Sequence, residues 1–239
     1  MCIDQIFSLF NEIIFSKTVK DMLAGSFISI LFVIFIEYLR QPKLRIMETD
    51  TIEQNYPESF PARKITSIRL KVINKRLPIF LRWLNRMPAL SCNGKILFYN
   101  INQVKVFDKT MSIRWIRSQM PIPIDGEWHG KLPHIYANNE NIEGKLRIYD
   151  PDRFMAESRI DIYPGEEEIF DVVARFDNDN DCYGWCNESF ISKPLWRNPE
   201  RRLNQGIYLL KIEINSSGTK LKGDFSLTNI NEDFRIKKQ

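Results

Sequence analysis

The sequence predicts a mainly β protein: an antiparallel, immunoglobulin-like β-sandwich behind one N-terminal transmembrane helix. Three observations lead to this prediction. Residues 22–39 form an apolar run long enough to cross a bilayer. Behind it, short segments alternate between apolar and polar residues with the period of two that is typical of half-buried strands. Turn residues separate these segments and no helical pattern alternates with them, which favours a sandwich over a parallel α/β fold.

Residues 1–21 form an amphipathic N-terminal segment. Its apolar side chains recur at helical spacing, and its polar side chains lie on the other faces. The apolar stripe consists of Ile3, Ile6, Phe7, Phe10, Ile13 and Ile14. Two interpretations fit this pattern: a helix lying in the membrane interface, or a helix packed against a protein partner.

Residues 22–39 are the predicted transmembrane helix. At helical rise they span about 27 Å, close to the hydrocarbon thickness of a bilayer. Glu37 is the only charged residue of the run and lies near its end, where the carboxylate can reach the headgroups. A buried core helix is the alternative, and the lack of a polar face argues against it. A cleaved signal peptide fits less well, because no basic region starts the chain and no small-x-small cleavage site follows the run.

The charges around the run predict a single-pass protein of the cell membrane with a cytoplasmic C-terminal domain. Two cations precede the run and three follow it closely, and the side with more cations usually faces the cytoplasm; they are Lys17 and Lys20 before the run, and Arg40, Lys43 and Arg45 after it. Residues 40–86 carry 11 Lys and Arg against 4 Asp and Glu. Such a basic stretch favours an anionic leaflet, although a solvated surface of a folded domain is the alternative interpretation.

The composition argues against a nucleic-acid partner. The net charge of +4 is too small to produce a dominating positive field. Arginine next to tryptophan, as at Arg82-Trp83 and Arg114-Trp115, is compatible with base stacking but does not by itself indicate it. The predicted partners are therefore the lipid bilayer and a protein.

Residues 40–64 are predicted to hold a juxtamembrane linker and a first strand, and residues 65–239 the sandwich. The clearest hairpin joins 207–214 to 219–229 through the turn Ser216-Ser-Gly218. On pattern alone, this pair resembles the last two strands of an immunoglobulin-like domain. Further strands are expected at 65–74, 95–100, 112–116, 145–149, 159–163 and 169–176, with a brief helical stretch at 77–84.

Several short phrases of the sequence resemble those of a family of bacterial single-pass membrane proteins with a β-rich C-terminal domain. The resemblance covers most of the chain, including the anchor and the Pro-Lys-Leu segment behind it, and it implies a prokaryotic membrane protein. It brings no known activity, ligand or catalytic residue. The phrases are Met87-Pro-Ala-Leu-Ser-Cys92, Ile162-Tyr-Pro-Gly-Glu166, Cys182-Tyr-Gly-Trp185, Pro194-Leu-Trp-Arg-Asn-Pro199 and Ser216-Ser-Gly218.

One acidic segment has the spacing of a calcium-binding loop. Carboxylates stand at its positions 1, 3 and 5, a backbone carbonyl is expected at position 7, and a glutamate stands at position 12; the residues are Asp177, Asp179, Asp181, Tyr183 and Glu188. The glycine usual at position 6 is replaced by Cys182, and no helices are expected beside the loop. The competing interpretation is an acidic, solvated loop between strands. No other cofactor is predicted.

The region around this segment also holds cysteines and tryptophans. Cys182 and Cys186 could bind a metal or form a disulfide, but zinc needs four ligands and no His or second Cys pair follows nearby. Free thiols in a reducing cytoplasm are the expected state. Trp185 and Trp196 lie in loop-like sequence. If exposed, they are candidate anchors for a protein partner; if buried, they close one end of the sandwich.

No catalytic motif is present in the sequence. Glu127 and His129 would share one face of a strand, as a general base and its orienting carboxylate do, and His134 follows. No nucleophile elbow, zinc-protease motif, phosphate-binding loop or dinucleotide fingerprint accompanies them. We therefore expect a membrane-anchored, non-enzymatic binding or scaffolding module. The alternatives are a membrane-tethered enzyme and a structural subunit of a membrane complex.

Overall fold

The computed structural model describes residues 17–55, 64–117, 123–126, 146–149, 159–190 and 197–239. These residues form two compact units. The first takes in residues 17–41 and 76–87, and the second takes in most of the remainder. The amphipathic stripe of residues 3–14 lies outside the described residues.

The first unit consists of the helix α2 (Lys17–Arg40) and the short 3₁₀ helix η1 (Ile79–Leu84). The helix α2 contains the whole predicted apolar run and begins five residues before it. Its apolar side chains surround the helix axis, so it has no polar face along the run. The brief helical stretch expected at 77–84 is confirmed as η1, which follows Pro78.

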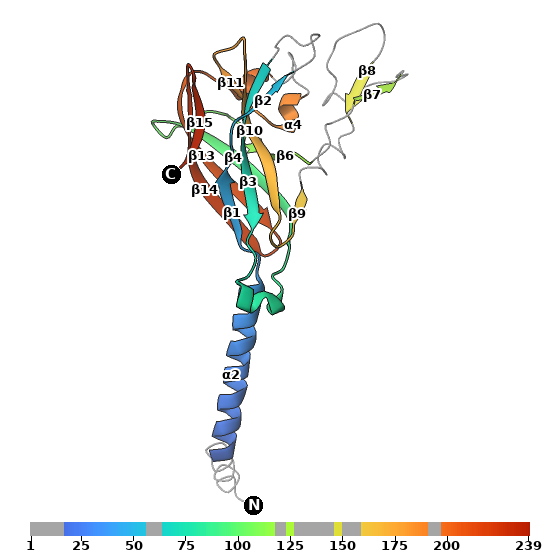
Figure 1. The fold of residues 1–239 in the computed structure, drawn as a ribbon, viewed down its shortest axis with the longest axis vertical. Coiled ribbons are helices and arrows are strands. Elements are labelled where there is room, and N and C mark those ends of the chain that lie inside the picture. The colour runs from blue at the N-terminus through green and yellow to red at the C-terminus, as the bar shows by residue number, and fades with distance from the viewer. Residues whose placement is uncertain (1–16, 56–63, 118–122, 127–145, 150–158, 191–196) are drawn as a thin grey trace, which may run out of the picture. The chain divides into compact units, whose positions relative to one another are not determined.

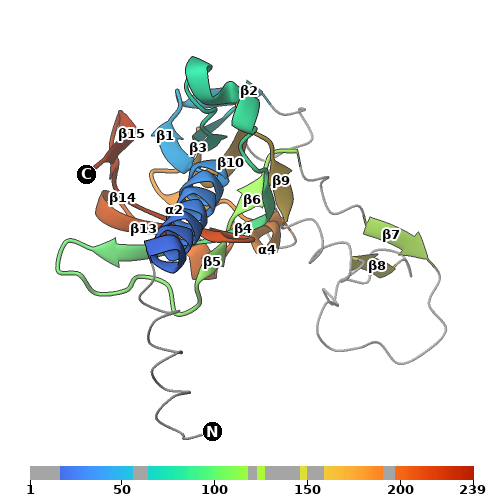
Figure 2. The same cartoon turned by 90° about the horizontal axis from the view of Figure 1, so that it is seen from below.

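The second unit is mainly β, with two antiparallel sheets packed together (Figures 1 and 2). In the larger sheet, the long strands β3 and β10 pair antiparallel and the other strands flank them. Its strands are β1 (Leu44–Glu48), β2 (Ile52–Asn55), β3 (Lys64–Asn74), β6 (Arg114–Trp115), β10 (Glu167–Phe176), β11 (Cys182–Gly184) and β12 (Arg202–Leu203).

The smaller sheet is built on the strand order β15-β14-β13-β4-β5, with β9 also paired to β4. Its strands are β4 (Ala89–Asn100), β5 (Met111–Ser112), β9 (Ile160–Ile162), β13 (Gly206–Ser216), β14 (Thr219–Ile230) and β15 (Asp233–Lys238). A separate pair joins β7 (Pro123–Gly126) to β8 (Leu146–Tyr149). Two single-turn helices, α4 (Asn187–Phe190) and η2 (Pro199–Arg201), complete the described elements.

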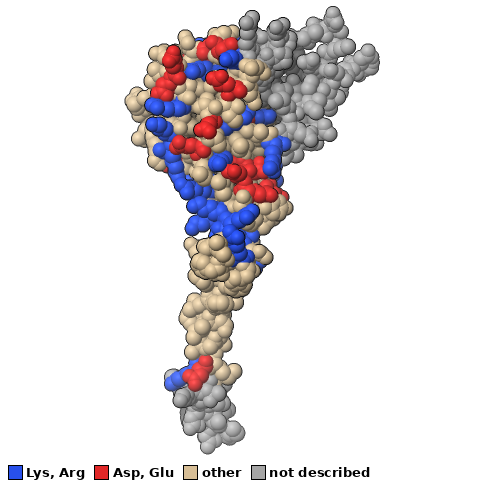
Figure 3. Space-filling model, viewed as in Figure 1, with Lys and Arg blue, Asp and Glu red and all other residues tan. Residues whose placement is uncertain are grey.

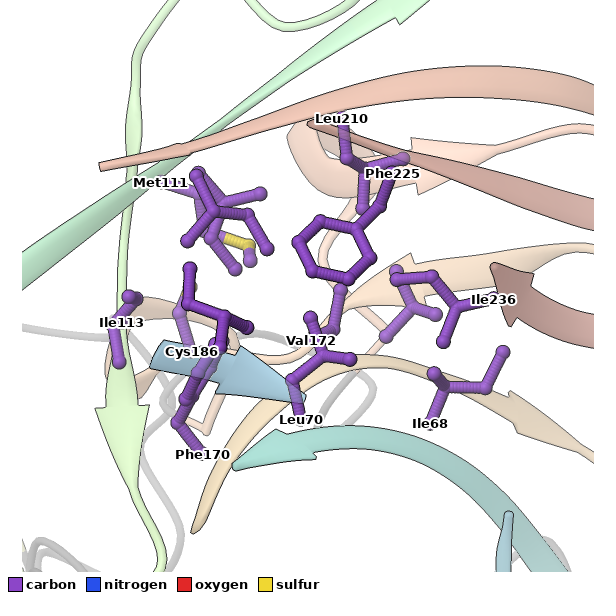
Figure 4. Close-up of a cluster of buried hydrophobic side chains, with 14 of the residues drawn as sticks. Ile68, Leu70, Met111, Ile113, Phe170, Val172, Cys186, Leu210, Phe225 and Ile236 are labelled. Atoms are coloured by element: carbon purple, nitrogen blue, oxygen red, sulfur yellow. The ribbon is translucent and has the colours of Figure 1, made fainter. Parts of the chain in front are cut away.

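The hydrophobic core lies between the two sheets. Figure 4 shows Leu210 and Phe225 of the smaller sheet pointing toward Leu70 and Val172 of the larger one. All four side chains are buried, as the alternation along their strands predicts. This shared core fixes which faces of the two sheets are left to meet other molecules.

The hairpin of β13 and β14 is confirmed. The two strands pair from Gly206 to Ser216, and Ser216 faces Thr219 across the turn. Gly218 has a φ of +84°, a left-handed conformation that glycine adopts without a steric cost. The pair is not the end of the sheet, however, because β15 adds to β14 after it.

Two sequence predictions differ from the observed fold. The single strand expected at 112–116 is divided: β5 pairs with β4 in one sheet, and β6 pairs with β10 in the other. The chain therefore crosses between the sheets at Ile113, which is buried in the core. In addition, residues 40–64 contain two strands rather than one, since both β1 and β2 pair with β3.

Candidate functional site

The helix α2 presents an apolar surface that no part of the described chain covers. Large aliphatic and aromatic side chains from Met22 to Phe35 have exposed fractions between 49% and 68%. In Figure 3 the helix shows no charged side chain along this stretch. Burying apolar surface stabilises a structure by about 25 cal/mol per Å², so a continuous column of this kind indicates an apolar surrounding.

The two serine hydroxyls in the apolar stretch of α2 are hydrogen-bonded within the helix itself. The hydroxyl groups of Ser26 and Ser29 donate to the carbonyl oxygens of Met22 and Gly25, at 2.9 Å each. These two hydroxyls therefore need no hydrogen bond from water, as is required of a polar group in hydrocarbon. At the C-terminal end, Arg40 pairs with Glu37 at 3.0 Å, which compensates the one carboxylate of the predicted span.

The segment Arg76–Met87 carries a second group of exposed apolar side chains. Ile79, Phe80 and Trp83 have exposed fractions of 78%, 76% and 71%. By contrast, Leu77 and Leu84 are buried. Leu77 and Leu84 therefore hold the segment in place, while Ile79, Phe80 and Trp83 face outward. Packing within the described chain does not account for the exposure of these three side chains.

This segment is hydrogen-bonded to the end of α2 within the first unit. The Met87 amide donates to the Arg40 carbonyl at 2.7 Å. The Arg86 guanidinium donates to the Gln41 carbonyl at 3.3 Å. The first bond satisfies one of the carbonyl groups that a helix end leaves without intrahelical partners, and the second binds the residue that follows the helix.

The predicted calcium ligands are divided between strand, turn and helix rather than gathered in one loop. Residues 182–184, positions 6–8 of the proposed loop, form β11, where Tyr183 lies between Ala174 of β10 and Arg202 of β12. Glu188 lies in α4, beyond the strand. A calcium loop instead needs a sharp turn at position 6, which a strand residue does not provide.

Each of the four carboxylates has protein partners. Asp177 accepts the Lys64 amide, and Asp179 accepts the Tyr183 hydroxyl at 2.7 Å and the Asp181 amide at 3.0 Å. Asp181 pairs with Arg202. These contacts order the turn between β10 and β11. They also engage the carboxylates of Asp177, Asp179 and Asp181 with donors from the protein.

The fourth carboxylate, Glu188, pairs with the buried Arg201 at 2.7 Å. Arg201 is 1% exposed and also donates to the carbonyl oxygens of Lys109 and Thr110. Across the described ranges, no group of three or more His, Cys, Asp or Glu side chains is placed to hold a metal ion. The calcium site stays a prediction, with Arg201 and Arg202 as the cations that calcium would have to displace.

Burial and Asp179 also change the acidity of Tyr183. Desolvation, followed by the hydrogen bond to Asp179, raises the pKa of Tyr183 to about 12. The phenol thus stays protonated at physiological pH and acts as a donor to Asp179. This role is structural and includes no group that titrates near neutrality.

Of the two predicted partner-binding tryptophans, Trp185 is 3% exposed. Its ring centroid lies 6.2 Å from that of Phe176, and its amide donates to the Val172 carbonyl at 3.0 Å. Of the two alternatives that the sequence leaves open, the structure shows the buried one, so the Trp185 side chain is not available on the surface. Trp196 lies outside the described residues.

The cysteines behave as buried thiols. Cys92, Cys182 and Cys186 are free and buried. Desolvation raises the pKa of Cys92 to about 11 and also raises the pKa values of Cys182 and Cys186. Protonated, inaccessible thiols are poor nucleophiles and metal ligands, which supports a packing role. The possible acid–base pair Glu127 and His129, and His134 with it, lie outside the described residues.

The smaller sheet has an outer face that the sequence analysis missed. On adjacent strands, Tyr99 of β4 lies opposite Leu209 of β13, and both are partly exposed. Ile207 at the start of β13 is 44% exposed, and Ile101 and Val104 of the loop after β4 are exposed still further. We call these five residues the β4–β13 patch. Their alternation is visible in the sequence, but the same pattern predicts only that one face is buried, not that the other remains apolar.

Comparison with models of protein families, with curated proteins and with solved structures finds no match to this chain.

Proposed function

We propose that this protein is a single-pass membrane protein in which α2 is the anchor and the β-sandwich is a non-enzymatic binding or scaffolding module. One observation carries the anchor: α2 exposes a column of large apolar side chains, and the hydroxyls of Ser26 and Ser29 within that column are hydrogen-bonded to the helix backbone. Its 24 residues span about 36 Å, enough for the hydrocarbon core and both flanks. An immunoglobulin-like topology and membership of the resembled bacterial family are further parts of this proposal.

A signal sequence is the alternative for the same helix, since membrane anchors and signal sequences can both be apolar helices near the N-terminus. Two features favour the anchor. Lys17, Lys20 and Asp21 precede the uncharged stretch, where a signal peptide has a short and purely basic start. The end of α2 is also hydrogen-bonded to the segment Arg76–Met87, and cleavage behind the helix would remove these bonds.

The binding role of the sandwich is supported by the β4–β13 patch. Exposed apolar patches rimmed by polar side chains often mark contacts with other proteins. Lys211, whose ammonium lies 5.2 Å from the Tyr99 ring centroid, provides a cationic border. We propose that a protein partner covers this patch, because it combines partly exposed and exposed apolar side chains with a single bordering cation, Lys211.

Protease protection tests the orientation. The excess of cations after α2 favours a cytoplasmic sandwich. Protease added to sealed, right-side-out vesicles is therefore expected to leave the sandwich intact, and inverted vesicles are expected to lose it. Immediate digestion in right-side-out vesicles would reverse the orientation. If the protein were instead found in the soluble fraction and not with either vesicle preparation, the anchoring role of α2 would be contradicted.

A further inference from the structure

The segment Arg76–Met87 combines two features that are rarely exposed together on a soluble surface. Phe80 and Trp83 lie three residues apart in η1, and side chains at this spacing eclipse in a 3₁₀ helix. They therefore share one face, with Ile79 beside them. Each of these three side chains is more than two-thirds exposed.

The same segment is strongly basic. It contains Arg76, Arg82 and Arg86 and no acidic residue, and Arg82 is exposed within η1 itself. A tryptophan beside arginines is typical of the membrane interface, where the indole lies at headgroup level and guanidinium groups meet phosphates. A water-facing loop has no reason to combine this charge with three large apolar side chains.

The position of the segment next to the end of α2 indicates that lipid contacts its exposed face. The Arg40 and Gln41 carbonyls at the end of α2 accept hydrogen bonds from Met87 and Arg86. If α2 spans a bilayer, its last residues lie at the bilayer surface, and a segment bonded to them lies there as well. Leu77 and Leu84 are buried, which leaves the Ile79, Phe80 and Trp83 face for the lipid.

We propose that Arg76–Met87 is an interfacial membrane-binding element. This proposal rests on the anchoring role of α2. Ile79, Phe80 and Trp83 enter the boundary between headgroups and acyl chains of the leaflet where α2 ends. The arginines bind the phosphates of anionic lipids. The element thereby gives the chain a second contact with the membrane surface, between the end of β3 at Asn74 and the start of β4 at Ala89.

The test uses the full chain, with Cys2 replaced by serine, in vesicles made of phosphatidylcholine and phosphatidylglycerol in equal parts. A cysteine introduced as F80C carries an environment-sensitive fluorophore, and lipids with a quencher at a shallow acyl position are added. The F80C label is expected to shift to the blue and to lose most of its emission. The matched control is I101C, which is 71% exposed but belongs to a loop of the sandwich, and whose label is expected to stay unquenched.

A third label, F27C in the middle of α2, separates this proposal from the anchoring role. If F27C is quenched by deep quenchers while F80C behaves as I101C does, the anchor stands and the interfacial element is refuted. If F27C is not quenched at all, the anchor fails, and the proposal fails with it. An I79C label with the same response as F80C guards against a local effect of one substitution, and unchanged circular dichroism verifies the fold.

The lipid charge tests the role of the arginines. One cation near an anionic surface changes the bound-to-free ratio about fivefold. R82Q is thus expected to lower the ratio of quenched to unquenched F80C label about fivefold in the anionic vesicles and little in pure phosphatidylcholine. Equal quenching in both lipids, insensitive to R82Q, would overturn the assignment of anionic headgroups. If the emission of the F80C label shifted to the blue only when other proteins were added, the face would be a protein-binding site and the proposal would be refuted.

Discussion

The Nε atom of Arg69 lies 2.9 Å from a carboxylate oxygen of Asp171, and the two residues stand directly opposite each other on β3 and β10. The other carboxylate oxygen pairs with Arg114, which faces Asp171 in the separate pairing of β6 with β10. Asp171 is fully buried. Burial raises the pKa of the Asp171 carboxyl above its ordinary value, and the guanidinium groups of Arg114 and Arg69 oppose that rise.

This row of charges predicts a large loss of stability for a single substitution. Asp171→Ala leaves two poorly solvated guanidinium groups without their anion, at a cost of about 3–5 kcal/mol of unfolding free energy. Chemical denaturation of the full chain in detergent measures it. Glu167→Gln is the control, because its pair with Lys71 is at the surface and contributes about 0–1 kcal/mol. Equal midpoints for the two variants would show that the buried row does not hold the sheet together.

Thiol chemistry provides a second prediction. Cys92, Cys182 and Cys186 are buried and their pKa values are raised, so none should react with an alkylating reagent at pH 8 in the folded protein. All three should react after denaturation. Mass spectrometry counts the modified sites. Rapid modification of Cys182 or Cys186 in the native state would mean that this end of the sandwich opens.

The raised pKa of Cys92 also predicts how stability depends on pH. The thiol is neutral in both states below its ordinary value near 9, so its contribution is complete there. Between about 9 and 11 only the unfolded chain ionises, and stability decreases by about 1.4 kcal/mol per pH unit for this group. Denaturation curves of the native chain and of Cys92→Ala over this range isolate the effect. An identical slope for both proteins would contradict it.

The calcium loop is expected to give a flat titration. Asp181 and Glu188 already pair with Arg202 and Arg201, and β11 replaces the turn that calcium coordination requires. Calorimetry at millimolar calcium is therefore expected to show no saturable heat. If heat of binding appears and disappears in Glu188→Gln, the predicted ligands do form a site, with the weak affinity of extracellular modules.

The β4–β13 patch is expected to bind a protein partner. Ile207→Asp introduces a charge into the patch and should lower the recovery of cross-linked partner from native membranes at least tenfold, since truncating a central contact typically costs about 2 kcal/mol or more. Tyr163→Asp is the control, as Tyr163 is 52% exposed outside the patch. Recovery that is equal for both variants would remove the patch from the binding role.

The elements that the sequence predicted well are those whose signals are local. The β13–β14 hairpin combines strict alternation with a Ser-Gly turn, so its register follows from neighbouring residues. The split of 112–116 between two sheets depends on pairing with β4 and β10, which lie far away in the chain. No local pattern contains that information.

The tryptophans show the same limit for the candidate sites. Trp83 and Trp115 both follow an arginine, yet Trp83 is 71% exposed and Trp115 is fully buried. Arg114 and Trp115 are placed in the core by their pairing with Asp171 and Phe170 of β10. The exposed face of η1 was similarly hidden in the sequence, because an apolar run such as Leu77–Leu84 is normally read as core. Its exposure is decided by the tertiary fold.

Alkaline carbonate extraction followed by intact-mass measurement tests the central claim most directly. Native membranes are washed at high pH, and the intact mass of the protein in the pellet is measured by mass spectrometry. We expect the protein in the pellet, with a mass that includes the residues of α2. A variant with Leu31→Arg and Val33→Arg should be extracted, because each arginine costs about 2.5–3.5 kcal/mol at the centre of a span. Native protein in the supernatant, or a mass that lacks the residues of α2, would contradict the membrane anchor.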